Sequence, residues 1–190
     1  MKKKIRLLMD CDGVLADFVG GTAKLYNRIT GRKLDPASIK VWDFTGSLEF
    51  ETPEQREYFE HLLRSPGFAM HLEPLSGSRE AVAILKNLVD LHIVTSPLSD
   101  STTWVHERVE WLKLHYGIDK KHIHHSDTKF VYSGDLFVDD KPEHVRAWDE
   151  ENPNGMALLW STPGNQGEKD VTYIGSWEGL IDLIKSRRKS

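Results

Sequence analysis

The chain contains short apolar runs that each stop at a polar or acidic side chain. The runs, each with the residue that follows it, are 5–9 with Asp10, 91–94 with Thr95, 136–138 with Asp139 and 156–160 with Ser161. Runs of this length, rich in valine, isoleucine and leucine, are typical of buried strands in a parallel sheet. We therefore predict a sheet whose strands carry reactive residues at their carboxyl ends.

Segments with helical periodicity lie between these runs. Residues 78–88, 103–116 and 178–185 repeat apolar side chains three or four positions apart, and Gly117 offers a stop for the second segment. Alternation of strands and helices predicts an α/β fold class, a Rossmann-like doubly wound parallel sheet.

One region interrupts the alternation. Residues 17–72 contain no convincing buried strand, whereas 18–29 and 53–63 have helical patterns. We expect residues 1–16 and 73–190 to form the α/β core, with 17–72 as a small helical cap inserted after the first strand.

Composition excludes several classes of protein. The net charge of -4 predicts no general affinity for nucleic acid or membranes, since phosphate backbones require a basic surface. The single cysteine, Cys11, cannot form an intramolecular disulfide, which suits a reducing compartment. The apolar run before Asp10 is too short for a signal peptide, and no segment approaches the roughly 20 apolar residues of a membrane span. We expect a cytoplasmic protein.

Acidic and hydroxyl side chains gather at the predicted strand ends. They are Asp10, Asp12, Thr95, Ser96, Asp139 and Asp140. In open α/β sheets, ligands bind beyond the carboxyl ends of the strands. Carboxylates that converge there repel one another unless a hard cation such as Mg2+ neutralises them. The alternative is that each aspartate merely caps a helix or turn, which explains one of them better than the whole set.

The segment from Asp10 to Phe18 is the most informative. Asp10 and Asp12 can face one ligand if the chain turns between them, and Gly13 permits such a turn. A carboxylate can attack phosphorus to form an acyl-phosphate. A second acid can protonate the leaving oxygen and later activate water.

Four motifs in order resemble the haloacid dehalogenase phosphatase superfamily. They are Asp10-Cys11-Asp12-Gly13-Val14-Leu15, then Thr95 after its strand, then Lys129, then Gly134 to Asp140. A closer similarity, to the 5′(3′)-deoxyribonucleotidases, spans most of the chain and is weakest in the insertion. It rests on residues 10–18 with Gly20-Gly21, 71–77, 95–98, 139–143 and Ser176-Trp177.

This resemblance implies a role for each matching residue. Asp10 would be the nucleophile and Asp12 the general acid and then base. Mg2+ would be held by the side chains of Asp10 and Asp139 and the main-chain carbonyl of Asp12. The phosphoryl oxygens would contact Thr95, Ser96 and Lys129. Asp140 would be a supporting acid that orients Lys129 or a metal-bound water.

The resemblance also implies substrate contacts. Phe18, Trp42 and Phe44 would line a pocket for a nucleobase, because stacking tolerates different bases. Arg108 replaces a substrate-contacting lysine of the family. The alternatives are that the cap aromatics form a small core of their own and that Arg108 lies on a solvated helix face.

Two other features invite metal or nucleophile interpretations. His122, His124 and His125 lack a second Cys/His pair at the spacing of structural zinc sites, so we interpret them as a turn or strand leading to Asp127. Cys11 is expected to point into the sheet, away from the acids.

The favoured hypothesis is a phosphatase of nucleoside monophosphates, a small-molecule substrate, with Mg2+ as cofactor. The alternatives are a phosphatase of another small ester such as a sugar phosphate, a polynucleotide end phosphatase, and a non-catalytic binding protein. A homodimer is expected only by analogy with relatives.

Overall fold

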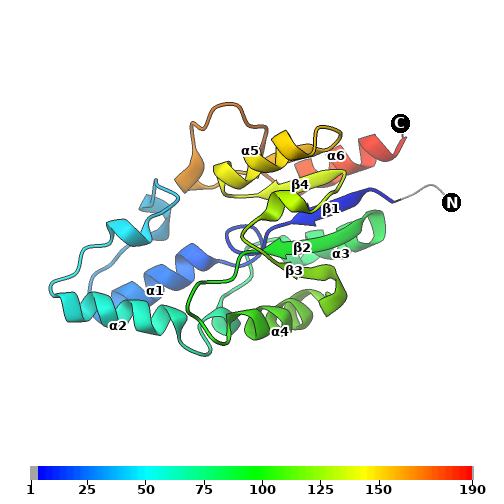
Figure 1. Ribbon diagram of the computed structural model, residues 1–190. Coiled ribbons are helices and arrows are strands. Elements are labelled where there is room, and N and C mark those ends of the chain that lie inside the picture. Colours follow the sequence, from blue (N-terminus) through cyan, green and yellow to red (C-terminus); the bar gives the residue numbers. More distant parts are fainter. Residues whose placement is uncertain (1–3, 190) are drawn as a thin grey trace.

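The structure is a computed structural model that describes residues 4–189, and its centre is a six-stranded sheet (Figure 1). The strands are β1 (Arg6–Met9), β2 (Asp90–Thr95), β3 (Ile123–His125), β4 (Leu136–Asp139), β5 (Met156–Trp160) and β6 (Tyr173–Ile174). Their order is β3-β2-β1-β4-β5-β6, and every neighbouring pair is parallel. The predicted parallel sheet is confirmed. The edge strands β3 and β6 are too short to leave a periodic signal in the sequence.

Within residues 4–189, six α-helices accompany the sheet. They are α1 (Phe18–Thr30), α2 (Pro53–Arg64), α3 (Ser78–Leu88), α4 (Trp104–Tyr116), α5 (Pro142–Glu151) and α6 (Trp177–Lys189). Buried side chains of α3, α4 and α6 form one apolar cluster with one face of the sheet, and those of α5 form another with the opposite face. The sheet is therefore doubly wound, as predicted.

Helix ends follow the local sequence. Thr52 caps α2 by accepting a hydrogen bond from the Gln55 N–H, and Glu54 occupies its first turn. Gly117 adopts a left-handed conformation (φ 58°) at the end of α4, where a side chain would be strained. The helix α5 was not predicted, because only Pro142, Val145 and Trp148 of its ten residues are buried.

The segment between β1 and α3 has an apolar cluster of its own. The cluster consists of Leu25, Tyr26, Ile39, Phe44, Leu48, Phe59 and Leu63. Figure 1 places α1 and α2 beyond the end of the sheet that lies away from the N-terminus. Because the chain passes from β1 into α1, this is the carboxyl end of β1. The segment thus stands over the predicted reactive strand ends.

Within residues 4–189, none of the helices combines the length and apolar character needed to cross a membrane.

Candidate active site

The strand order brings the predicted reactive residues together. The central strand β1 lies between β2 and β4, with Met9 in register with Ile93 on one side and Val138 on the other. Asp10 follows directly and donates its main-chain N–H to the Val138 carbonyl at 2.8 Å. The ends of three strands therefore supply Asp10, Thr95 and Asp139 to one edge of the sheet.

A tight loop follows Asp10. The Cys11 carbonyl accepts hydrogen bonds from the N–H groups of Leu15 and Ala16, at 2.7 and 2.8 Å. Gly13 has a φ of +78°, and a Cβ there would lie 2.0 Å from Asp140 Oδ2. The turn that presents Asp12 therefore requires glycine at position 13.

Lys129 is the buried cation between two aspartates. Its Nζ lies 2.7 Å from Asp10 Oδ1 and 2.8 Å from Asp139 Oδ2. The Cys11 N–H donates to the same Asp10 oxygen at 2.7 Å, so within the described part of the chain Asp10 Oδ2 has no hydrogen-bond donor. Burial and then the charge of Asp139 raise the pKa of Asp10 to about 7, although Lys129 opposes them. Asp10 thus keeps one oxygen available to a ligand.

The two aspartates after β4 differ in their surroundings. Asp139 accepts hydrogen bonds from the Lys141 main-chain N–H at 2.8 Å and from Lys129, and its Oδ2 lies 3.2 Å from His144 Nδ1. Burial is outweighed by these contacts, so the pKa of Asp139 is lowered. Burial and the nearby charges of Asp139 and Asp10 instead raise the pKa of Asp140 well above its usual value.

These carboxylates form one cluster. Asp10, Asp139 and Asp140 each offer an oxygen, and the three oxygens lie within 4.8 Å of one another. From the sequence we expected Asp140 to orient Lys129 or a metal-bound water, but the structure also places its carboxylate within the cluster formed by Asp10 and Asp139. Oxygen-only donors of this kind suit a hard divalent cation.

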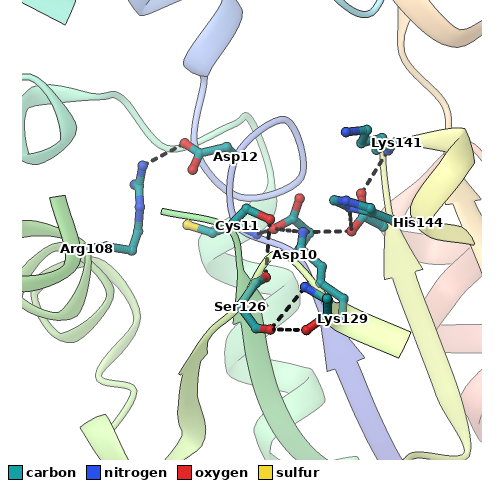
Figure 2. Close-up of polar contacts among 11 residues, drawn as sticks. Asp10, Cys11, Asp12, Arg108, Ser126, Lys129, Lys141 and His144 are labelled. Atoms are coloured by element: carbon teal, nitrogen blue, oxygen red, sulfur yellow. Dashed lines mark hydrogen bonds and ion pairs between the residues drawn. The ribbon is translucent and has the colours of Figure 1, made fainter. Parts of the chain in front are cut away.

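Asp12 is held by Arg108 from the other side of the loop (Figure 2). Arg108 Nη2 donates to Asp12 Oδ1 at 2.6 Å. The Arg108 side chain is fully buried, and its guanidinium lies 5.2 Å from each of the Trp104 and Trp111 rings. The interpretation of Arg108 as part of a solvated helix face is therefore wrong. Burial raises the pKa of Asp12, and the charge of Arg108 opposes that rise.

The buried polar atoms near this pair include several without partners. Among the described residues, Thr95 Oγ1 and both Nε and Nη1 of Arg108 have no hydrogen-bond partner. The Ser96 hydroxyl donates to the Ser126 carbonyl at 3.3 Å. Buried polar groups are normally paired, so Thr95, which lines the cavity, retains donor capacity for a ligand. Arg108, predicted to contact the substrate, does not line the cavity and reaches it only through Asp12.

A cavity of about 800 Å³ opens above these residues. The polar residues that line it include Asp10, Asp12, Thr95, Ser96, Lys129 and Asp140. Its aromatic residues are Phe18, Trp42 and Phe44 from the 17–72 segment, Trp104 from the start of α4 and Trp160 from the end of β5. A large apolar cavity with a few convergent polar groups is the usual form of a small-molecule site.

The aromatic wall agrees only in part with the sequence hypotheses. Phe44 is 4 % exposed and packs in the apolar cluster of the 17–72 segment, although it also lines the cavity. Trp42 is 41 % exposed, and its ring lies 4.5 Å from Lys141 Nζ. Trp104, which packs edge-on against Phe18, was missed because its position at the start of a helix carries no signal of its own.

Cys11 behaves as expected for a structural residue. It is fully buried within the apolar cluster that includes β1. Burial raises the pKa of its thiol, which makes the thiolate scarce. Cys11 is therefore a poor nucleophile in this site.

Solved structures define the class to which this fold belongs. A HAD-family hydrolase from Deinococcus radiodurans with bound phosphate and sodium superposes with a TM-score of 0.63 at 15 % identity, over 98 % of each chain. A magnesium-bound HAD hydrolase from Bacillus subtilis gives a TM-score of 0.61 at 16 % identity, over 96 % of this chain and 99 % of that one. The protein has the fold of the haloacid dehalogenase-like hydrolases.

The sequence comparisons narrow this class to a family. The family model described as 5′ nucleotidase, deoxy (pyrimidine), cytosolic type C protein matches residues 3–189. The human cytosolic 5′(3′)-deoxyribonucleotidase is 32 % identical, over 96 % of both chains. The mouse mitochondrial 5′(3′)-deoxyribonucleotidase is also 32 % identical, over 97 % of this chain and 89 % of its own. The chain belongs to the 5′(3′)-deoxyribonucleotidase family, whose members are named as nucleotidases, a kind of phosphoric monoester hydrolase.

Proposed function

We propose that the protein is a Mg2+-dependent phosphatase that hydrolyses nucleoside monophosphates, deoxyribonucleotides above all, through a phosphoaspartyl intermediate on Asp10. The observation that carries this proposal is the position of Asp10 in the cavity. One of its oxygens is fixed by Lys129 and Cys11, and the other is left without a donor by the described residues. Asp12 stands two residues further on, at the same cavity.

In the first proposed step, an Asp10 oxygen attacks the phosphorus atom. The bond between phosphorus and the nucleoside oxygen breaks, and that oxygen takes a proton from Asp12. Burial raises the pKa of Asp12, which favours the protonated form that a general acid needs. Thr95 and Lys129 would hold the equatorial oxygens, because positioning and charge neutralisation dominate phosphoryl transfer.

In the second proposed step, water attacks the phosphorus of the acyl-phosphate. Asp12, now ionised, takes a proton from that water, and the bond between phosphorus and Asp10 breaks to release phosphate. The Arg108 guanidinium, 2.6 Å from Asp12, stabilises the ionised form that this step requires. We propose that Arg108 also positions Asp12 between the two steps.

The carboxylate cluster fits a magnesium ion. Asp10, Asp139 and Asp140 together carry more negative charge than Lys129 can neutralise. Burial, and then the charges of the neighbouring carboxylates, raise the pKa values of Asp10 and Asp140. The side chains of Asp10 and Asp139 and the main-chain carbonyl of Asp12 would hold the ion, and Asp140 is a further candidate ligand. Bound magnesium would offset the repulsion between Asp10 and an incoming phosphate dianion.

Aromatic walls favour a nucleobase over a bare sugar. Phe18, Trp42 and Trp104 offer apolar faces to the cavity, whereas a sugar pocket requires mainly polar contacts. A polynucleotide end would require a basic groove, which is hard to reconcile with a net charge of -4. A purely binding function would not need both Asp10 and Asp12.

We further propose that residues 17–72 act as a cap over the cavity, since this segment supplies Phe18, Trp42 and Phe44 to it. A cytoplasmic location and a homodimer remain part of the proposal. The first accords with the single buried cysteine, and the second rests on analogy with relatives.

A substrate panel tests the proposal. Purified protein would be assayed for phosphate release from 5′- and 3′-mononucleotides, sugar phosphates and a 3′-phosphorylated oligonucleotide, with Mg2+ or with EDTA. The proposal expects the highest kcat/KM on deoxynucleotides and loss of activity in EDTA. A higher kcat/KM on a sugar phosphate would overturn the substrate assignment, and full activity in EDTA would overturn the metal dependence.

A further inference from the structure

A second cluster of metal-ligating side chains lies on the β2–β3 edge of the sheet. Asp90 and His92 are two positions apart along β2, so their side chains project from the same face of the sheet. The register pairs Ile93 with Ile123 and Val94 with His124, and His122 ends the short turn that directly precedes β3. The rings of His92 and His122 are 5.0 Å apart between centroids. The strand β2, the strand β3 and the turn before it therefore bring four potential ligands together.

The contacts within this cluster are short. His92 Nε2 lies 3.3 Å from Asp90 Oδ2, and His92 Nδ1 lies 2.9 Å from His124 Nε2. Asp90, His92 and His122 each offer a ligand atom within 4.8 Å of the others, and all three are partly buried. One ion can thus contact all three residues after small side-chain movements.

We propose that Asp90, His92 and His122 form a binding site for a divalent transition-metal ion such as Zn2+. Two imidazole nitrogens and one carboxylate are a donor set that suits zinc, nickel or copper and not magnesium. Three protein ligands leave a coordination position for water. His124 would act as a positioning residue through its contact with His92.

The His92–His124 contact supports this arrangement. A histidine that binds a metal through one ring nitrogen commonly donates the N–H of the other nitrogen to a neighbour, which fixes its tautomer. If His92 Nδ1–H donates to His124, the Nε2 lone pair of His92 faces the Asp90 carboxylate. Two acceptors that face each other repel unless a proton or a cation lies between them. A metal ion at this point removes the conflict.

Arg6 is the natural competitor for the site. Its Nε lies 3.3 Å from Asp90 Oδ2, and both side chains are partly exposed, at 45 % and 36 %. An exposed pair of this kind contributes at most about 1 kcal/mol, so Arg6 can be displaced by an ion. Removal of the Arg6 side chain should therefore strengthen metal binding.

The cluster is separate from the carboxylate site. His92 precedes Thr95 by three residues of β2, or about 10 Å at the rise of an extended strand. The two sites thus lie toward opposite ends of one strand. A metal at the Asp90 end would join β2 to the start of β3, the three-residue edge strand. We therefore expect binding to stabilise the fold without being needed for turnover.

The spacing of these residues in the sequence did not predict this site. His122 and His124 lack a second ligand pair in their own segment, and the fold supplies Asp90 and His92 from the neighbouring strand. Only the register of β2 against β3 brings the four residues together.

Calorimetric titration with Zn2+ in excess Mg2+ tests the proposal, because the excess Mg2+ would occupy the proposed carboxylate site. The wild-type protein should bind one equivalent and show a higher Tm. His92→Gln and His122→Gln should weaken binding by at least about tenfold, and His124→Gln by about 10–100-fold, as for residues that orient a ligand. Arg6→Ala should bind more tightly than the wild type.

The matched control is His106→Gln, an exposed histidine of α4 outside the cluster, which should bind as the wild type does. Cu2+ electron paramagnetic resonance adds a direct readout, since two imidazole ligands produce nitrogen hyperfine splitting that His122→Gln should reduce. Equal binding by the wild type and the cluster variants would overturn the site, as would the absence of binding in Arg6→Ala. Nucleotidase activity is not the readout, so failure here is distinguishable from failure of the proposed function.

Discussion

Replacement of Arg108 by methionine tests whether Arg108 acts on catalysis through its hydrogen bond to Asp12. The change removes a fully buried guanidinium whose Nη2 donates to Asp12 Oδ1 at 2.6 Å, while it retains most of the side-chain bulk between two tryptophan rings. A hydrogen bond to a charged group contributes about 1.5–3 kcal/mol. Breakage of a fully buried ion pair costs about 3–5 kcal/mol, but the Asp12 side chain is 22 % exposed to the cavity, so we expect the lower range.

If this energy acts on the transition state, kcat/KM for a nucleoside monophosphate should fall by about 10–100-fold, since each 1.4 kcal/mol corresponds to tenfold. The assay compares this substrate with p-nitrophenyl phosphate, whose leaving group departs without a proton from Asp12. Because kcat/KM reports the steps up to formation of the phosphoenzyme, the loss should be much smaller for p-nitrophenyl phosphate.

Two further variants complete the test. Arg108→Lys keeps the positive charge but lacks the planar guanidinium, so its kcat/KM for the nucleoside monophosphate should lie between those of Arg108→Met and the wild type. Arg79→Met, at an exposed position on α3, should leave both kcat/KM values unchanged. An equal loss on both substrates in Arg108→Met would refute the argument that Arg108 acts through Asp12.

Other predictions address the nucleophile, the buried cation and the pocket wall. With Mg2+, Asp10→Asn should abolish turnover. In EDTA, the same substitution should raise Tm more at about pH 8 than at about pH 4, because a folded-state pKa of about 7 makes the wild type lose stability as pH rises between those values. A rise in Tm confined to low pH would contradict a raised pKa of Asp10 in the folded protein. Lys129→Met removes the buried cation shared by Asp10 and Asp139 and should lower the free energy of unfolding in urea by about 3–5 kcal/mol; a loss under about 1 kcal/mol would argue against these ion pairs. Phe44→Ala should lower stability by about 3–5 kcal/mol, whereas Trp42→Ala should mainly raise the nucleotide KM, and the opposite pattern would reverse their assignments.

Most of the fold was accessible from local patterns. The runs that end at Asp10, Thr95 and Asp139 are strands whose side chains are mostly apolar and buried, so each run was visible in the sequence without knowledge of its neighbours. The helix α5 and the edge strand β3 were not visible in the same way. Their apolar positions are few, and their place is set by packing against the rest of the sheet.

The site was predictable only where strand ends carry it. Asp10 and Asp139 meet because parallel strands end at one edge, which is a property of the fold class. Lys129 contacts both from the short turn between β3 and β4. The contact between Arg108 and Asp12 joins residues that are 96 positions apart and depends on how α4 packs, so its geometry needed the structure. The contribution of Trp104 to the cavity wall likewise depends on tertiary packing.

The central claim is that Asp10 becomes phosphorylated during turnover. The most direct measurement is to quench the protein in acid while it hydrolyses a deoxynucleoside monophosphate with Mg2+, to reduce it with borohydride, and to map the peptides by mass spectrometry. An acyl-phosphate at Asp10 should be reduced to an alcohol, so the peptide that contains residue 10 should lose the mass of one carboxyl oxygen and gain two hydrogens. Continued turnover with position 10 unmodified at every quench time would contradict the account.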